Sequence, residues 1–102
     1  MTIQFSYKKI SQKSKFFLEN YVKEKKGRIQ TLISESDYKD ARLEVRSEKF
    51  AKKEAFKVEL FLSFSNHNFI SSEDDHTIIE AFDLALDKLI IQLRRYHEKI
   101  KN

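Results

Sequence analysis

The chain contains no cysteine, no proline and a single glycine, Gly27. Without cysteine there is no disulfide scaffold, no thiolate metal site and no cysteine nucleophile. One glycine leaves no glycine-rich phosphate loop and argues against the strained nucleophile elbow of hydrolases. No glycine- or serine-rich linker and no internal repeat is present, so we expect residues 1–102 to form one domain.

Long apolar runs are missing as well. No stretch approaches the ~20 apolar residues that a membrane-spanning helix needs. The first residues, Met1 to Phe5, are too short and too polar a segment for a signal peptide. We therefore expect a cytoplasmic protein without a membrane partner, and the lack of cysteine fits a reducing cytosol.

Charged residues make up 35% of the chain and hydrophobic residues 40%, a mixture typical of globular proteins. Lysine and arginine outnumber the acids by 20 to 16, which gives a net charge of +4. A basic balance suggests an anionic partner such as a nucleic acid. Many basic proteins bind no nucleic acid, so the distribution of charge along the chain is a better indicator of a nucleic-acid partner than the net charge.

Alternation of apolar and polar residues predicts four strands. The first covers residues 2–9, and the second lies around residues 42–46. Residues 56–64 hold five inward positions in strict alternation and form the clearest strand. Residues 66–68 (Asn-His-Asn) predict a hairpin turn, because Asn tolerates the required backbone angles. A fourth strand should follow over about residues 69–72.

Residues 12–33 change to a helical period, with Ser11 or Ser14 as the cap at the start. Gly27 inside this helix costs roughly 1 kcal/mol relative to alanine. A close approach of helix to sheet would explain it, and so would tolerated sequence drift. Residues 34–40 read as a polar loop. The apolar stripe of the helix predicted over residues 12–33 consists of Leu18, Tyr21, Val22, Ile29, Leu32 and Ile33.

A long second helix should begin at about Thr77, with the acidic run of residues 73–75 preparing its N-terminus. Its apolar stripe is too wide for a two-stranded coiled coil, so we expect the helix to pack on the sheet. The order β-α-β-β-β-α predicts an α+β fold with two helices on one face of a four-stranded sheet. The apolar stripe of this second long helix consists of Ile79, Phe82, Leu86, Leu89, Leu93, Tyr96 and Ile100.

The charges of the last helix are split. Acids occupy its first half, and bases dominate from Lys88 to the end. Helix-dipole complementarity explains the sign of this pattern, at under ~1 kcal/mol per charge, but does not require so many bases. The first helix is also rich in bases. Two such helices side by side would form one positive surface that suits a phosphate backbone. The bases are Lys13, Lys15, Lys23, Lys25, Lys26, Arg28, Lys88, Arg94, Arg95, Lys99 and Lys101.

Most aromatic residues fall at predicted core positions, so the sequence does not predict stacking on nucleobases. Phe61 is the exception, on the outer face of its strand, where it is either a contact point or an isolated exposed side chain. The three histidines show no metal-ligand spacing. We find no active site, and we expect neither an enzyme nor a cofactor, metal or small-molecule substrate.

The segment from Ala81 to Lys99 resembles a helix of the ribosome hibernation-promoting factor and ribosome-associated inhibitor A family, which reads roughly A-I-D-x-x-x-D-K-L-x-R-Q-L-x-K-x-K-x-K. The segment from Leu18 to Ile29 is similar to the family's first helix, and residues 45–49 resemble its second strand. The matching residues of the last helix are Ala81, Asp83, Asp87, Lys88, Leu89, Gln92, Leu93, Arg95 and Lys99.

The resemblance implies a fold like that of double-stranded-RNA-binding domains, and binding to the small ribosomal subunit in the mRNA channel near the decoding centre. Family members bound there exclude mRNA and tRNA and keep ribosomes inactive under stress or in stationary phase. Basic side chains contact phosphates of the ribosomal RNA. By position, these contacts would come from Lys8, Lys25, Arg28, Lys88, Arg95 and Lys99.

Two of the family's basic positions differ, and Thr77, Ile78 and Ile79 replace the family's Asp-Met-Tyr. Ile91 stands where the family usually has arginine, and His97 where it often has lysine; we expect Arg94 and Lys26 to compensate from neighbouring positions. The chain most resembles the family's short form, which works with a partner factor to pair ribosomes. Two other interpretations remain. One is a double-stranded-RNA-binding-like module for another structured RNA, and the other is a protein-interaction domain that uses the outer sheet face around Phe61.

Overall fold

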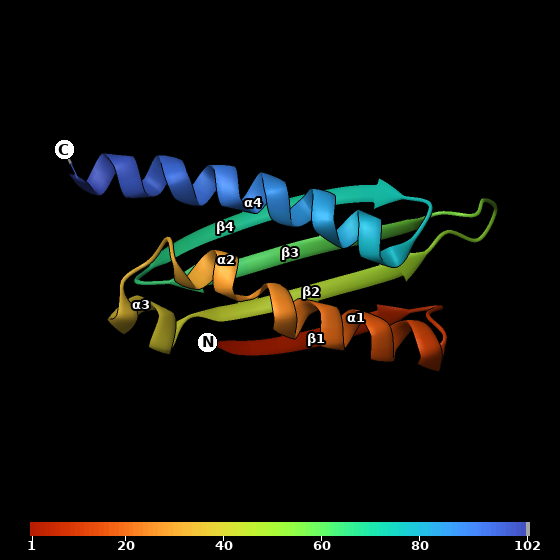
Figure 1. Cartoon of the computed structure of the whole chain (residues 1–102). Helices are drawn as coiled ribbons and strands as arrows, with labels where there is room; N and C mark the ends of the chain where they lie inside the picture. The colour runs from red at the N-terminus through yellow and green to blue at the C-terminus, as the bar shows by residue number, and fades with distance from the viewer. Residues whose placement is uncertain (102) are drawn as a thin grey trace.

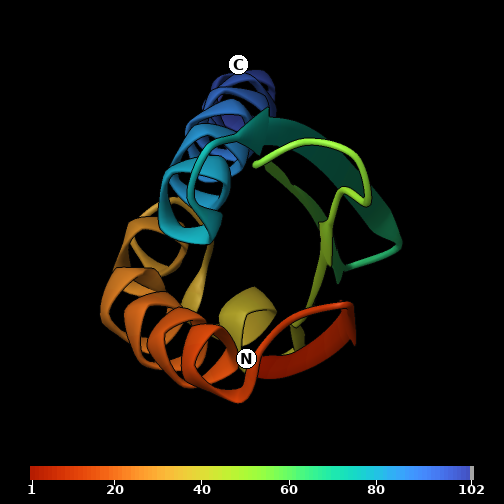
Figure 2. The ribbon, with the colours of Figure 1, turned by 90° about the vertical axis from the view of Figure 1, so that its right-hand side faces the viewer.

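The computed structural model describes residues 1–101, with side chains described as far as Lys99. Its helices all lie on one side of a single sheet (Figures 1 and 2). The side chains of Ile100 and Lys101, predicted as an apolar and a basic position of the last helix, lie outside the described part. The elements are β1 (Thr2–Lys8), α1 (Gln12–Lys25), α2 (Gly27–Gln30), α3 (Glu35–Asp40), β2 (Arg42–Lys49), β3 (Phe56–Phe64), β4 (His67–Asp75) and α4 (Ile78–Lys101).

The four strands pair in the order β1-β2-β3-β4, and the predicted α+β fold is confirmed. β1 and β2 are parallel, so the chain must cross over between them, and α1 to α3 lie in this crossover. The other pairs are antiparallel. The register aligns Phe5, Val45 and Leu60 across three strands on the inner face. A slip of one residue would turn this apolar row to solvent.

The core lies between the sheet and the helices. α4 crosses β3 and β4 along its length, while α1 lies beside it toward β1 (Figures 1 and 2). Leu60 and Leu89 are fully buried, and the ring of Phe82 meets Tyr21 of α1 edge to face at 5.9 Å. Both helices therefore share one apolar layer, which fixes how their polar faces are arranged. Within the described residues, no helix combines the length and apolarity needed to cross a membrane.

The predicted single helix over residues 12–33 is wrong in its extent. α1 ends at Lys25, and the short α2 begins at Gly27. A Cβ at Gly27 would meet nothing within 4 Å, so a close helix–sheet approach does not explain this glycine. Glycine is a poor helix former, which fits a break at this point. The predicted apolar stripe is nevertheless confirmed, since its residues are buried or pack against the core. Ser11 is the cap, accepting from the Ser14 amide at 3.1 Å.

The predicted loop over residues 34–40 contains α3 instead. The side chain of Ser34 accepts a hydrogen bond from the Asp37 amide at 3.0 Å, and Glu35 and Asp37 lie in the first turn. Both features favour a helix start. Apolar periodicity could not reveal this helix, because none of its residues is buried.

The β3–β4 hairpin also differs from the prediction. Its turn consists of Ser65 and Asn66, both with positive φ, and His67 already pairs with Phe64. β4 continues to Asp75, so the acidic residues 73–75 belong to the strand rather than to the approach to α4. Thr77 caps α4 instead, since its hydroxyl accepts from the Glu80 amide at 3.1 Å.

Candidate nucleic-acid interface

Hydrogen bonds and an ion pair join the two helical segments that were predicted to form a common surface. The hydroxyl of Tyr21 on α1 lies 2.7 Å from both carboxylate oxygens of Asp83 on α4. Farther along, Arg28 Nη1 of α2 donates to Asp87 Oδ1 at 2.9 Å. Asp83 and Asp87, in the acidic first half of α4, therefore face α1 and α2.

Burial, and then the hydrogen bond to Asp83 and the charge of that carboxylate, raise the pKa of Tyr21 to about 12. The Tyr21 phenol therefore stays protonated and donates to Asp83 at neutral pH. This contact fixes α1 against α4, and with it the spacing of the basic side chains farther along both helices.

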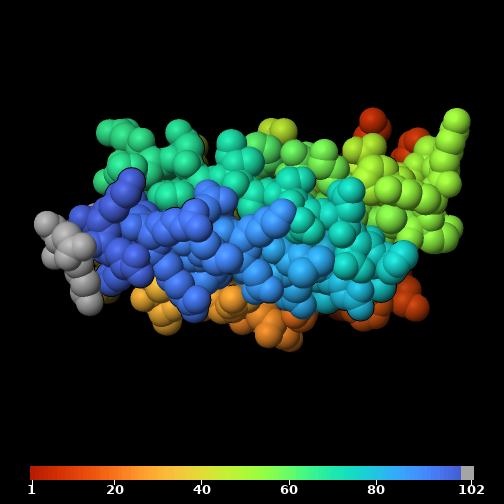
Figure 3. Space-filling view, turned by 90° about the horizontal axis from the view of Figure 1, so that it is seen from above, coloured from red at the N-terminus to blue at the C-terminus, as the bar shows by residue number. Residues whose placement is uncertain are grey.

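The second half of α4 carries three exposed bases that are available to a partner. Arg94, Arg95 and Lys99 are all exposed. Among residues 1–99, no carboxylate lies within ion-pair distance of any of the three. Figure 3 shows α4 open along its length, between β4 on one side and α1 and α2 on the other. These three bases are therefore accessible to a large anionic partner.

Lys25 and Lys26 stand where α1 gives way to α2. Lys25 is half-buried, with its ammonium 5.3 Å from the centroid of the Tyr21 ring, and Lys26 is exposed. The break at Gly27 places both bases near Arg28, which pairs with α4. Because Tyr21 bonds to Asp83, Lys25 lies on the side of α1 that faces α4.

Three predicted contact residues already have acidic partners. Arg28 pairs with Asp87, and Lys88 pairs with Glu73 on the β4 edge. Lys8 pairs with Glu48 at 3.7 Å and lies on the outer sheet face, because Ile3, Phe5 and Tyr7 of the same strand point to the core. The fold therefore separates Lys8 from the helical bases, and a phosphate would have to compete for Arg28 and Lys88.

Both departures at the family's basic positions are exposed. Ile91 is 48% exposed, and His97 is on the surface of the last turns of α4. Arg94, predicted to compensate, lies one helical turn after Ile91 and is exposed as well. The basic face of α4 is thus interrupted by an apolar side chain before it continues.

The prediction that Phe61 is the exceptional exposed aromatic is wrong. Phe16 and Phe17 on α1 are 66% and 51% exposed, and they belong to the helix face opposite Leu18 and Val22. Phe61 is half-buried, with the Arg46 guanidinium 4.4 Å from its ring centroid. The helical period of the sequence already indicated that Phe16 and Phe17 are exposed, since neither residue falls on the apolar stripe.

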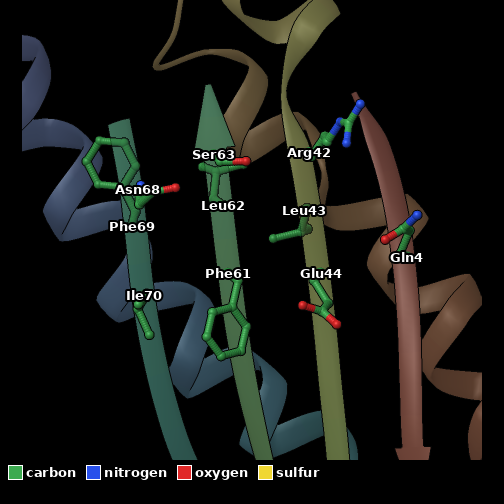
Figure 4. Close-up of a pocket in the computed structure, with 10 residues that line it drawn as sticks. All are labelled: Gln4, Arg42, Leu43, Glu44, Phe61, Leu62, Ser63, Asn68, Phe69 and Ile70. Atoms are coloured by element: carbon green, nitrogen blue, oxygen red, sulfur yellow. The ribbon is translucent and has the colours of Figure 1, made fainter. Parts of the chain in front are cut away.

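The outer sheet face has a different character. Neighbouring strands place opposite charges side by side, as in the row Lys8, Glu48, Lys57 and Asp74. Near Phe61 and Ile70 the face holds a shallow hollow of about 400 Å³ (Figure 4). Acids and bases alternate on this face, so it lacks the excess of positive charge that a phosphate backbone requires.

Comparison with known proteins identifies the family. Residues 3–101 match the family model described as sigma 54 modulation protein / S30EA ribosomal protein. The chain belongs to this family. The ribosome-associated family predicted from the last helix is thereby confirmed. No curated protein matches the sequence.

Solved structures agree on the fold. The N-terminal domain of Thermus thermophilus Protein Y is similar with a TM-score of 0.73 and 19% identity, over 94% of this chain and 99% of that chain. A ribosomal subunit interface protein from Coxiella burnetii is similar with a TM-score of 0.70 and 14% identity, over 94% and 97% of the two chains. At these identities the likeness establishes the fold.

Proposed function

We propose that this S30EA-family protein is a ribosome hibernation factor that binds the small ribosomal subunit in the mRNA channel near the decoding centre. Its helical face would contact ribosomal RNA there, exclude mRNA and tRNA, and inhibit translation under stress. The exposed bases Arg94, Arg95 and Lys99, beyond the acidic half of α4, carry the proposal. The name of the similar Coxiella burnetii structure, a ribosomal subunit interface protein, supports it. A cytoplasmic location follows from a ribosomal partner.

Electrostatic occupation of an RNA site is the proposed mechanism. Lysine and arginine side chains that neutralise phosphates release counterions, which drives binding without any covalent step. Arg94, Arg95, Lys99, Lys25 and Lys26 make the first contacts in this scheme. The protein then acts by excluding other ligands from the channel, and it needs no catalytic residue.

Arg28 and Lys88 contribute to RNA binding by exchanging their carboxylate partners for phosphates. Their present ion pairs, with Asp87 and Glu73, are partly exposed, and such pairs typically contribute at most about 1 kcal/mol. A phosphate can therefore replace either carboxylate at small cost. Lys8 would contribute only through a separate RNA segment that reaches the outer sheet face.

Sedimentation with purified 30S subunits tests the proposal. The wild-type protein should co-sediment at low salt, and replacing Arg94, Arg95 and Lys99 together by alanine should greatly weaken binding. Each lost phosphate contact should reduce the slope of log affinity against log salt by about one unit. The matched control replaces Arg42, Arg46 and Lys57 of the outer sheet face by alanine, which removes the same charge. Equal losses for both triple variants would refute a helical binding face.

A competition experiment separates the ribosome from other structured RNA. An unrelated double-stranded RNA, in molar excess over 30S subunits, should leave co-sedimentation intact if the channel is the site. Complete displacement by this duplex would favour the double-stranded-RNA-binding-like alternative. The outer-face alternative predicts instead that Phe61→Ala abolishes association while the helical triple variant retains it.

A further inference from the structure

The outward ridge of α1 carries a pair of adjacent exposed aromatic rings. The rings of Phe16 and Phe17 lie 6.2 Å apart at an interplanar angle of 60°, with 66% and 51% of these residues exposed. A single exposed apolar side chain is ordinary, but two bulky rings in mutual contact expose a continuous apolar surface. The core does not use them, since Leu18 and Val22 form the buried side of this helix.

Positive charge surrounds the two rings. The ammonium of Lys13 lies 5.8 Å from the centroid of the Phe17 ring. Lys13 lies three and four residues before the two phenylalanines, and Lys23 lies seven residues after Phe16, so both lysines share the outward ridge. Residues 8–17 contain four lysines and no acid. The ridge therefore combines aromatic faces with cations.

Lys13 and Lys15, in the first turn of α1, oppose the stability of that helix. α1 has no acid in its first turn, whereas α3 begins with Glu35 and Asp37 and α4 carries Glu80 in its first turn. Bases at the positive end of the helix dipole are unfavourable by typically 0.3–1 kcal/mol each. Ser11 already caps the helix, so no anion is needed at its free amides. Of the two long helices, α4 follows the local rule and α1 breaks it, which indicates selection of α1 for contact with a partner.

We propose that Phe16, Phe17 and Lys13 form a stacking site for an unpaired nucleobase of the bound RNA, an inference that rests on the proposed function. Proteins read single-stranded RNA by stacking splayed bases on aromatic rings while cations hold the adjacent phosphates. The ridge supplies both groups. It also continues through Lys23 to the bases at the end of α1, so one RNA strand can follow the helix from the stacking site to the phosphate contacts.

A tryptophan reporter tests stacking directly. The chain contains no tryptophan, so Phe17→Trp introduces the only indole. A single-stranded 12-nucleotide oligoadenylate should quench its fluorescence, because a stacked base deactivates the indole. The same 12-mer in a duplex with its complement should quench far less. Absence of quenching by the single strand would overturn the proposal, as would a blue shift with anionic phosphatidylglycerol vesicles and no response to RNA, which would indicate a membrane surface.

Affinity for 30S subunits separates stacking from simple apolar contact. Replacing both rings by leucine keeps apolar area but removes the aromatic faces, and binding should weaken by at least about fivefold, toward 150-fold if a whole stacked base is lost. Ile70→Ala, which removes a 57% exposed apolar side chain from the other face, should bind like the wild type. Equal binding of the double leucine variant and wild type would overturn the stacking site.

Failure of the proposed function would look different. If wild-type protein does not bind 30S subunits, the ribosomal site is wrong, and quenching of Phe17→Trp by the oligonucleotide would still support stacking on single-stranded RNA. If wild-type protein binds and the double leucine variant binds equally well, the ribosomal site stands and the stacking inference is refuted. Unchanged thermal unfolding of the double variant would show that any loss of binding is local.

Discussion

The helical face and the outer sheet face are both rich in charge, yet they differ in how the charges are arranged. On the sheet, cross-strand neighbours alternate in sign, as Glu48 does between Lys8 and Lys57. Opposite charges on paired strands stabilise a sheet and cancel each other at a distance. On the helices, acids gather at one end of α4 and bases at the other, so Arg94 and Arg95 project a positive field. The arrangement of the charged residues, rather than their number, therefore distinguishes the helical face from the outer sheet face.

The largest predicted effect contrasts the two sides of the sheet at adjacent positions of β3. Leu60 is fully buried on the inner face, and Leu60→Ala should lower the free energy of unfolding by about 2–5 kcal/mol. Phe61 is half-buried on the outer face, and Phe61→Ala should lower the free energy of unfolding by only about 1 kcal/mol. Urea titration of both variants measures the difference. Similar losses would mean that the outer face is packed as tightly as the core.

The helix–helix contact should give the next largest effect. Tyr21→Phe removes the hydrogen bond to Asp83, and it should cost about 1–2 kcal/mol at pH 7, because the acceptor is charged. The pKa of Tyr21 is raised in the folded state, so its contribution is fully present below the unfolded pKa of about 10. It is lost as pH rises toward the folded pKa of about 12.

The difference in stability between Tyr21→Phe and wild type should therefore shrink as pH rises from about 10 toward 12, as measured by urea unfolding at each pH. Comparing the two proteins at each pH cancels the titration of shared groups. Burial and the nearby Glu19 also raise the pKa of Tyr7, so Tyr7→Phe provides a parallel control. A constant difference across this range would contradict the role of the Tyr21 phenol.

Removing one acid from the helical face should increase the excess of positive charge on that face relative to the outer sheet face. Asp87→Asn releases Arg28 and adds one positive charge, so affinity for 30S subunits at low salt should rise about two- to fivefold. Stability should change by less than about 1 kcal/mol, because the pair is exposed. Glu59→Gln on the outer sheet face adds the same charge and serves as the control. A matching rise in the control would show that net charge alone sets the affinity.

The smallest effect concerns the break between α1 and α2. Gly27 has negative φ and open space around its Cβ position, so Gly27→Ala should stabilise the protein by up to about 1 kcal/mol. Thermal unfolding measures this gain. Binding to 30S subunits should stay within about twofold, because Lys26 and Arg28 keep their places. A loss of stability would show that the break itself needs glycine.

Local pattern predicted much of the fold. The alternation along residues 56–64 and the apolar stripe of the last helix match β3 and α4, because each pattern follows from burial of one face. α3 was missed because it buries none of its residues, and its start depends on a cap at Ser34. The hairpin was misplaced by one residue, since Ser65 shares the positive φ of Asn66 although serine rarely signals it.

The candidate site was predictable only as a set of bases. The sequence by itself determined the four strands and the two main helices, the excess of positive charge and the family pattern from Ala81 to Lys99. Only the tertiary structure decided that Arg28 and Lys88 hold carboxylates, that Lys8 lies on the opposite face, and that Phe16 and Phe17 remain exposed. The physical reason is that ion pairing and exposure depend on which distant segments pack together, as Asp87 and Arg28 do, and periodicity within one element carries no such information.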